Sequence, residues 1–257
     1  MVEALGSEII KITKAGQEFL ALLFRTIGLS FVPPFRVKDI VKQIDFVAWQ
    51  SAPIILFCLC FAAIVTIIEA SFHMKIVIQN DSLVPGFSTL LIIRELGAVV
   101  TALLITSRVG AGLTAEVGSM KVTEQIDALK MLGIDPVPFL VVPRFIACVI
   151  SGFLLTIIAN VVCIGAAMVV SNLKLGYSPA SFVQAMRAFV EFQDLWFASI
   201  KGLCFGAVIP IISCYYGFRC QAGAEGVGAA TTKSVVSSSI AIIFIDFVLS
   251  YVFSHFY

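Results

Sequence analysis

Five apolar segments, each long enough to cross a bilayer, constrain this chain more than any other feature. About 20 consecutive apolar residues in a helix span the hydrocarbon core of a membrane. The segments cover roughly residues 46–70, 86–108, 144–170, 194–216 and 235–256. The chain is 60% hydrophobic and only 13% charged, whereas a soluble domain carries about 25% charged residues. The sequence therefore predicts an all-α integral membrane protein with five transmembrane helices.

The first 45 residues differ from these spans because charged residues recur among the apolar ones. Between residues 3 and 28 the apolar side chains follow a helical spacing, interrupted by Glu8, Lys11, Lys14, Glu18 and Arg25. This pattern is typical of an amphipathic helix that lies in the membrane interface. The Val32-Pro33-Pro34 step ends it, and a short basic helix follows. We expect residues 1–45 to form interfacial elbow helices and residues 46–257 to form one membrane domain.

The positions of Lys and Arg predict the orientation of the chain. The first 45 residues carry six of them, residues 108–144 carry four, and Arg219 and Lys233 lie on the same predicted side. The opposite side has Lys75, Lys174 and Arg187. Cytoplasmic segments of membrane proteins carry an excess of Lys and Arg. We therefore expect a cytoplasmic N-terminus and, after five crossings, a C-terminus on the outer side.

Four charged residues lie deep inside the predicted spans, away from their ends. Arg94 and Glu95 are adjacent in the second span, Lys201 is in the fourth and Asp246 is in the fifth. At about 1.5 Å per helical residue, they reach one layer roughly 12–15 Å from the outer ends. Each charge alone would cost about 2.5–3.5 kcal/mol there. We expect Lys201 to pair with Asp246, and Arg94 to pair with a carboxylate, because pairing offsets much of this cost.

Two interpretations of these charges remain open. Adjacent helical residues point about 100° apart, so Arg94 and Glu95 are not expected to face one partner helix together. This favours a polar cavity, open to the outside, in which the headgroup of a substrate could lie. In the alternative, the charge pairs only fix helix packing. Glu69, near the outer end of the first span, either borders the same cavity or is simply interfacial.

The segment between the second and third spans predicts a helix over residues 116–132. Apolar residues form a stripe at Val122, Ile126, Leu129 and Leu132, and charged residues occupy the other side. Gly133 suits a left-handed C-cap, and Pro136 blocks continuation. We expect this helix to lie along the cytoplasmic face, with one side free to contact a partner; the alternative is a solvated surface loop. Gly202 and Gly206 add a weak signal for close helix packing in the fourth span.

Motifs for nucleotide or metal chemistry are absent from the sequence. It contains no G-x-x-x-x-G-K-[ST] phosphate loop, no H-E-x-x-H and no G-x-S-x-G. We therefore expect neither an enzyme nor a cofactor in this chain. The net charge of +1 gives no field that would attract nucleic acid. Any driven work would take its energy from another chain.

Two sequence blocks closely resemble the signature of the MlaE/YrbE permease family, the membrane subunits of MCE-type ABC transporters of lipids. They are RELGAVVTALLITSRVGAGLTAEVGSMKVTEQIDALKMLGIDPVPFLVVPR (94–144) and GAEGVGAATTKSVVSSSIAIIFIDF (223–247). Ala98 stands where the family usually has Pro, which leaves a kink at that point in doubt. Glu69 stands where Gln is common, which could alter headgroup preference.

The resemblance implies a permease of the bacterial inner membrane that moves phospholipid or a related lipid to or from the periplasmic side. It implies a homodimer with two cytoplasmic ATPase subunits, which bind ATP and Mg²⁺, and a periplasmic ring of MCE-domain subunits. By the same resemblance, Arg94, Glu95 and Glu69 border the lipid cavity, and Lys201 and Asp246 form an intramembrane pair. The residues that couple to the ATPase would be Glu116, Met120, Lys121, Glu124 and Asp127.

Two other functions are compatible with the residues alone. A proton-coupled secondary carrier could use Glu95 and Asp246 as relay groups, and a structural scaffold could use the charges only for assembly. The odd number of spans and the absence of an internal repeat disfavour the carrier, since inverted repeats are common in secondary transporters.

Overall fold

The computed structural model describes residues 2–33, 36–74, 76 and 83–256, and the side chains of residues 13–33, 36–74, 76 and 83–255. No strand occurs among them, and five helical stretches are long and apolar enough to cross a membrane. These stretches are Val37–His73, Val84–Val122, Val137–Leu175, Phe192–Phe218 and Ala224–His255. Each contains or closely matches one predicted span, so the all-α membrane fold with five spans is confirmed.

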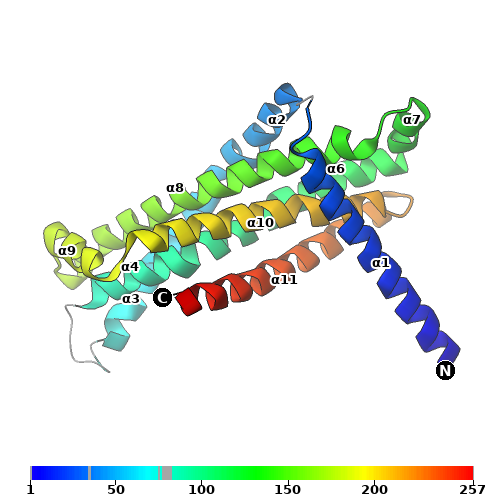
Figure 1. The fold of residues 1–257 in the computed structure, drawn as a ribbon. Coiled ribbons are helices and arrows are strands. Elements are labelled where there is room, and N and C mark those ends of the chain that lie inside the picture. Colours follow the sequence, from blue (N-terminus) through cyan, green and yellow to red (C-terminus); the bar gives the residue numbers. More distant parts are fainter. Residues whose placement is uncertain (1, 34–35, 75, 77–82, 257) are drawn as a thin grey trace.

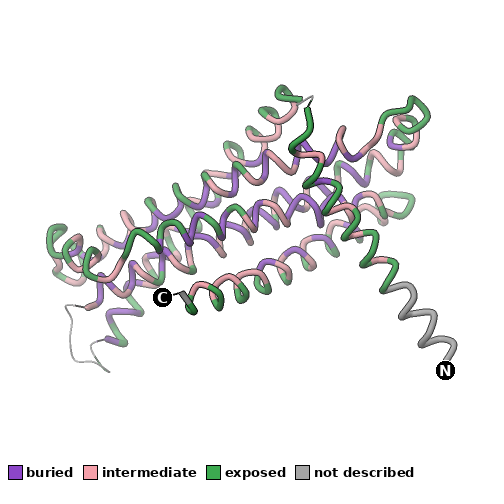
Figure 2. Tube along the Cα trace, in the orientation of Figure 1, coloured by how far each residue is buried: buried purple, intermediate pink, exposed green. Residues whose placement is uncertain are grey.

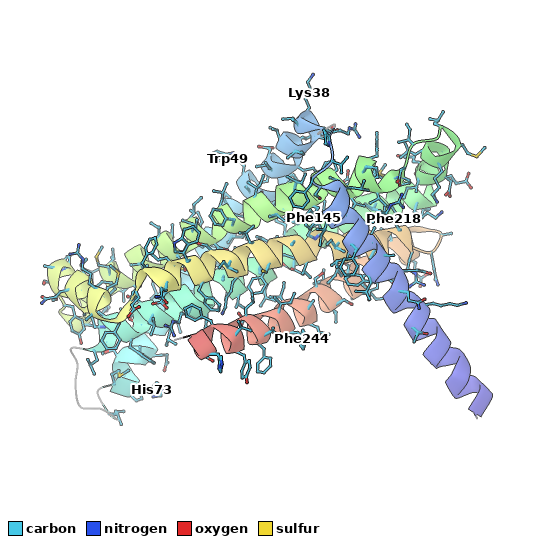
Figure 3. The ribbon with its side chains drawn as sticks, in the orientation of Figure 1. Lys38, Trp49, His73, Phe145, Phe218 and Phe244 are labelled. Atoms are coloured by element: carbon cyan, nitrogen blue, oxygen red, sulfur yellow. The ribbon has the colours of Figure 1, made fainter. Side chains whose placement is uncertain are left out.

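The first span begins earlier than the sequence suggested. Helix α2 (Val37–Ile44) runs through a π-helical segment, η1 (Asp45–Trp49), and a turn into α3 (Ala52–His73). The expected boundary at residue 45 therefore falls inside a continuous helical stretch. Figure 3 shows Lys38 and Trp49 pointing away from the other helices. The basic start of this stretch is thus an exposed extension of the first span, which suits a place at the membrane surface.

The second span alternates between two kinds of winding. It consists of α4 (Val84–Leu91), η4 (Ile92–Val100), α5 (Thr101–Ile105), η5 (Thr106–Gly110) and α6 (Ala111–Val122), of which η4 and η5 are π-helical. Such wide turns inside α-helices occur frequently at functional sites. The nine-residue η4 holds both Arg94 and Glu95.

Helices α8 (Val142–Leu175) and α10 (Phe192–Phe218) form the centre of the bundle and run side by side in Figure 1. Their backbones meet at glycines. A Cβ atom on Gly206 would lie 2.5 Å from the carbonyl oxygen of Cys148, and one on Gly152 would lie 2.8 Å from that of Gly202. The weak GxxxG signal in the fourth span therefore marks a real helix–helix contact, which only glycine permits at this distance.

The remaining helices lie around this pair. Helix α9 (Pro179–Phe189), which the sequence analysis did not foresee, packs against α4 and is capped by the Ser178 hydroxyl, which accepts from the Ser181 N–H at 3.2 Å. Helix α11 (Ala224–Phe256) lies at the edge of the bundle, and much of its surface is exposed in Figure 2. Helix α1 (Val2–Leu29) crosses one end of the bundle steeply and extends away from it (Figure 1).

The predicted helix over residues 116–132 is wrong as a single element. Helix α6 ends at Val122, and a second, short helix, α7 (Gln125–Met131), follows a break at Thr123 and Glu124. Glu124 adopts a left-handed backbone conformation with φ of 59°, which no helix interior contains. The end of α7 is as expected: Gly133 has φ of 73°, and the N–H of Ile134 donates to the carbonyl of Leu129 at 2.9 Å.

Candidate functional site: a charge cluster within the spans

Lys201 is the centre of a cluster of charged side chains from three spans. It is fully buried, and its ammonium lies 2.7 Å from Asp246 Oδ1 on α11 and 3.0 Å from Glu95 Oε1 on η4. It also donates to the carbonyl oxygen of Arg94 at 2.9 Å. The structure thus brings Lys201 together with its expected partner Asp246. The contacts with Glu95 and with the Arg94 carbonyl are hydrogen bonds, whereas Asp246 balances the charge as an ion pair.

Arg94 has a carboxylate partner that the sequence analysis did not name. Its Nε donates to Asp194 Oδ1 at 2.6 Å, and Asp194 is fully buried in the first turn of α10. The second oxygen of Asp194 accepts from the backbone N–H of Glu191 at 2.9 Å, which caps the helix. The E-x-x-D spacing at residues 191–194 is a capping-box variant, and it was the available signal for this residue.

The expectation that Arg94 and Glu95 cannot both face one helix is wrong. Both reach α10, because their partners Asp194 and Lys201 lie seven residues apart, about two turns along that helix. Long side chains on the widened turns of η4 span this distance. The angle between the two residues therefore does not distinguish a polar cavity from charge pairs that only fix helix packing. The exposure of their side chains to the surroundings does.

The cluster is closed on one side and open on another. An aromatic pair walls it: the rings of Phe197 and Phe253 stack with centroids 4.0 Å apart, and Lys201 lies 4.8 Å from the Phe197 ring. The side chain of Glu95 is 48% exposed and that of Arg94 is 28% exposed, whereas Lys201 and Asp194 are fully buried. The open side therefore presents the Glu95 carboxylate and part of the Arg94 guanidinium to whatever lies beside this chain.

Glu69 lies apart from the contacts that define the cluster. Its side chain is 64% exposed on α3, and its carboxylate lies 3.6 Å from His73, one turn further along the same helix. Figure 3 shows His73 at the end of the bundle. Within the described part of the single chain, the structure does not bring Glu69 together with Arg94 and Glu95.

The predicted coupling residues gather around α6 and α7. Asp127 on α7 pairs with Lys121 on α6 across the break at 2.7 Å, and with Lys130 one turn further along α7 at 3.1 Å. Both lysines donate hydrogen bonds to Asp127 and hold the pKa of its carboxyl group below the ordinary value. Glu124 is exposed at the break, and the half-buried Met120 packs against the apolar cluster that includes Ile126. The structure thus places these residues around one short loop.

Two details of this region differ from the sequence analysis. Glu116 lies 2.9 Å from the buried Arg144, so it holds α6 to α8 within the chain. Leu132, predicted to lie on the buried stripe, is 75% exposed, and its neighbour Met131 is 89% exposed. The break after Val122 turns the end of α7 outward. The protruding surface is therefore more apolar than the charge pattern suggested.

Comparisons with known proteins agree with this architecture. The sequence model of the family described as Permease MlaE matches residues 40–252. A probable ABC transporter permease protein of Rickettsia typhi is 33% identical over 245 residues, which cover 95% of this chain and 94% of that protein. The intermembrane phospholipid transport system permease protein MlaE of Haemophilus influenzae is 32% identical over 251 residues, 97% of this chain and 95% of that protein. The chain therefore belongs to the MlaE permease family.

Proposed function

We propose that this permease moves phospholipid, or a related lipid, between the inner membrane and the periplasmic or outer-membrane side. Membership of the MlaE family supports a lipid-transport permease, and the Haemophilus relative is named for phospholipid transport. The observation that carries the proposal is the half-open charge cluster. A fully paired network that only fixed packing would have no reason to expose a carboxylate and a guanidinium within the spans.

The open side of the cluster offers two opposite charges to a headgroup. The partly exposed guanidinium of Arg94 suits a phosphate, and the exposed carboxylate of Glu95 suits a cationic group such as an ammonium. The buried partners Asp194 and Lys201 hold these two side chains in place. In this proposal Glu69 contacts the lipid further towards the outer end of the bundle, from its exposed position on α3.

The proposed assembly is a homodimer with two ATPase subunits at the α7 end and an MCE-domain ring at the other end. In this arrangement the N-terminus is cytoplasmic and the C-terminus periplasmic, and the partner ATPase binds ATP and Mg²⁺. The exposed Met131 and Leu132 at the tip of α7, beside the Asp127 bridges, provide an apolar anchor with charged surroundings. Interfaces commonly combine an apolar centre with a polar rim.

The test compares lipid transport by the complete transporter carrying Glu95→Arg with the wild type. We expect transport to fall at least tenfold, because the substitution reverses the exposed charge and repels Lys201. Lys174→Ala, at an exposed cation outside the cluster, serves as the control and should transport normally. Equal membrane insertion of both variants must be verified. Wild-type transport by Glu95→Arg would overturn the proposed site.

A proton-coupled carrier remains the second candidate, on one observation. Two cations, Arg94 and Lys201, are surrounded by three carboxylates, those of Glu95, Asp194 and Asp246. The cluster can therefore take up a proton and become neutral. Lipid movement by the isolated chain under a pH gradient, without ATP, would support this alternative; strict dependence on ATP would exclude it.

A further inference from the structure

A pocket of about 290 Å³ opens between α1, α10 and α11, at the end of the bundle that also carries α7. Arg219 and Lys233 line it, together with the tyrosines Tyr215 and Tyr216, and no carboxylate is among its lining residues. Small residues, including Ala15 and Ala229, leave the space open. A pocket with two cations and no anion in its walls is suited to a negatively charged group.

Neither cation is neutralised by a strong ion pair. Within the described part of the chain, Lys233 has no ion-pair or hydrogen-bond partner for its exposed side chain. Arg219 lies 5.2 Å from the Tyr215 ring, and its contact with Glu18 is long, at 3.5 Å between two largely exposed side chains. Exposed pairs of this kind contribute little. The Arg219 guanidinium also donates to the Tyr215 hydroxyl, which is neutral, so the positive charge keeps no close anionic partner. A guanidinium has five N–H donors, which is more than these two contacts use.

The depth of the pocket places it at the level of lipid headgroups. Helix α11 has 33 residues and is about 50 Å long, so roughly 10 Å of it extends beyond a 30 Å hydrocarbon core at each end. Lys233 is nine residues from the start of α11, or about 14 Å, near the edge of the hydrocarbon. Asp246 lies a further thirteen residues along the helix, about 20 Å away, so the pocket is distinct from the charge cluster.

We propose that this pocket binds the phosphate of an anionic phospholipid from the surrounding membrane. Arg219 and Lys233 would hold the phosphate, and the acyl chains would extend into the surrounding bilayer. Basic pockets between membrane helices recognise anionic headgroups in this way. This lipid is a resident partner and not the transported cargo, so the proposal goes beyond the proposed function. Because Ala15 and Glu18 belong to α1, the bound lipid stabilises the attachment of α1 to the bundle.

The experiment uses the full chain in nanodiscs of phosphatidylcholine, with and without phosphatidylglycerol. Native mass spectrometry measures retained phosphatidylglycerol, and the melting temperature measures stabilisation. We expect Lys233→Ala and Arg219→Ala each to lower the preference for phosphatidylglycerol about fivefold, the factor for about 1 kcal/mol per basic residue near an anionic surface. Ala229→Leu retains both cations but fills the pocket, and it should lower the preference as well. Lys174→Ala, at the opposite end of the bundle, is the matched control.

Three results would overturn the proposal. The first is an unchanged phosphatidylglycerol preference in Lys233→Ala, Arg219→Ala and Ala229→Leu. The second is equal stabilisation by inorganic phosphate alone, which would identify a site for a free anion. The third is that the variants keep the lipid preference but lose the co-purifying ATPase, which would identify a protein interface. Transport of cargo lipid by Glu95→Arg is a separate readout, so failure here leaves the proposed function intact.

Discussion

A lysine in the middle of a membrane span needs partners for its charge. Lys201 donates hydrogen bonds to the Glu95 carboxylate and to the Arg94 backbone carbonyl, both in η4, and forms an ion pair with Asp246 on α11. The backbone contact matters because it fixes Lys201 to the second span even when a carboxylate is protonated or displaced. The acceptors that can change partners are therefore the side chains, and Glu95 is the most exposed of the two carboxylates.

The buried Asp194 offers a direct test at the scale of one residue. Asp194→Asn retains an oxygen for the Glu191 N–H but removes the charge that pairs with Arg94. We expect a loss of about 2 kcal/mol in stability, below the usual 3–5 kcal/mol for one half of a buried pair because Arg94 is partly exposed. The melting temperature in detergent measures it. Asp39→Asn, which removes half of the exposed pair with Arg36, should leave that temperature nearly unchanged.

The cost of isolated charges in lipid made much of this cluster predictable from sequence. Arg94, Glu95, Lys201 and Asp246 stand out because charged residues are rare in apolar spans, and two of them were paired correctly. Asp194 did not stand out, because it lies at the end of a predicted span, where charges are ordinary. Its burial depends on α10 packing against η4, which is a tertiary feature with no local signal.

At the scale of elements, the contact between α8 and α10 depends on missing side chains. Gly206→Ala would place a Cβ 2.5 Å from the Cys148 carbonyl oxygen, so the two helices must separate. We expect a loss of about 1–3 kcal/mol, the usual cost of overpacking. Gly165→Ala, in α8 and with nothing within 4 Å of the new Cβ, should be neutral or stabilising by up to about 1 kcal/mol. A melting temperature for Gly206→Ala no lower than that for Gly165→Ala would contradict this account.

For Asp127, beside the break between α6 and α7, we expect a substitution to affect binding of a partner. Asp127→Lys removes both ion pairs, with Lys121 and Lys130, and should lower recovery of the proposed ATPase partner on purification about fivefold. Lys38→Glu, an exposed charge change on α2, is the control.

The pH dependence of the Asp127 ion pairs is a separate prediction. The pKa of the Asp127 carboxyl group lies below the ordinary value of about 3.9, so in the wild type both ion pairs are intact above that pH. They are lost only as the pH falls through the lowered pKa. Recovery from wild type should therefore be independent of an Asp127 titration between about pH 5 and 8, and a steep change there would point to another group.

The five membrane-spanning helices were predictable from the sequence, whereas the break between α6 and α7 and the π-helical segments were not. The apolar runs set the five spans because lipid demands length and hydrophobicity. The break at Thr123 and Glu124 lacks the glycine or proline that normally marks such a site, so the periodicity of Val122 and Ile126 suggested a continuous helix. The π-helical segments likewise follow from packing against neighbouring helices, and no residue type announces them.

At the scale of the whole molecule, α11 carries a row of exposed apolar side chains that a second copy of the chain could bury. Exposed apolar residues follow one face of this helix at spacings of four, three and four: Ile240, Phe244, Phe247 and Tyr251. If the proposed homodimer forms through this face, Phe244→Glu should shift the purified protein from dimer to monomer in mild detergent. Val161→Glu, on the exposed face of α8, controls for a charge in a lipid-facing position. The mass of the detergent-solubilised particle decides, and an intact dimer in Phe244→Glu would place the interface elsewhere.

The mixed winding of the second span has a mechanical consequence. A slip of one residue in the hydrogen-bond register of η4 or η5 would rotate everything beyond it by about 100° without breaking the helix. Glu95 lies at one end of that path, and α6 and α7 lie at the other. Such a slip would let a movement of the loop between α6 and α7 reach Glu95 as a rotation of the second span about its own axis. Faster amide exchange in residues 92–100 and 106–110 than in the α-helical Thr101–Ile105 between them would reveal this freedom.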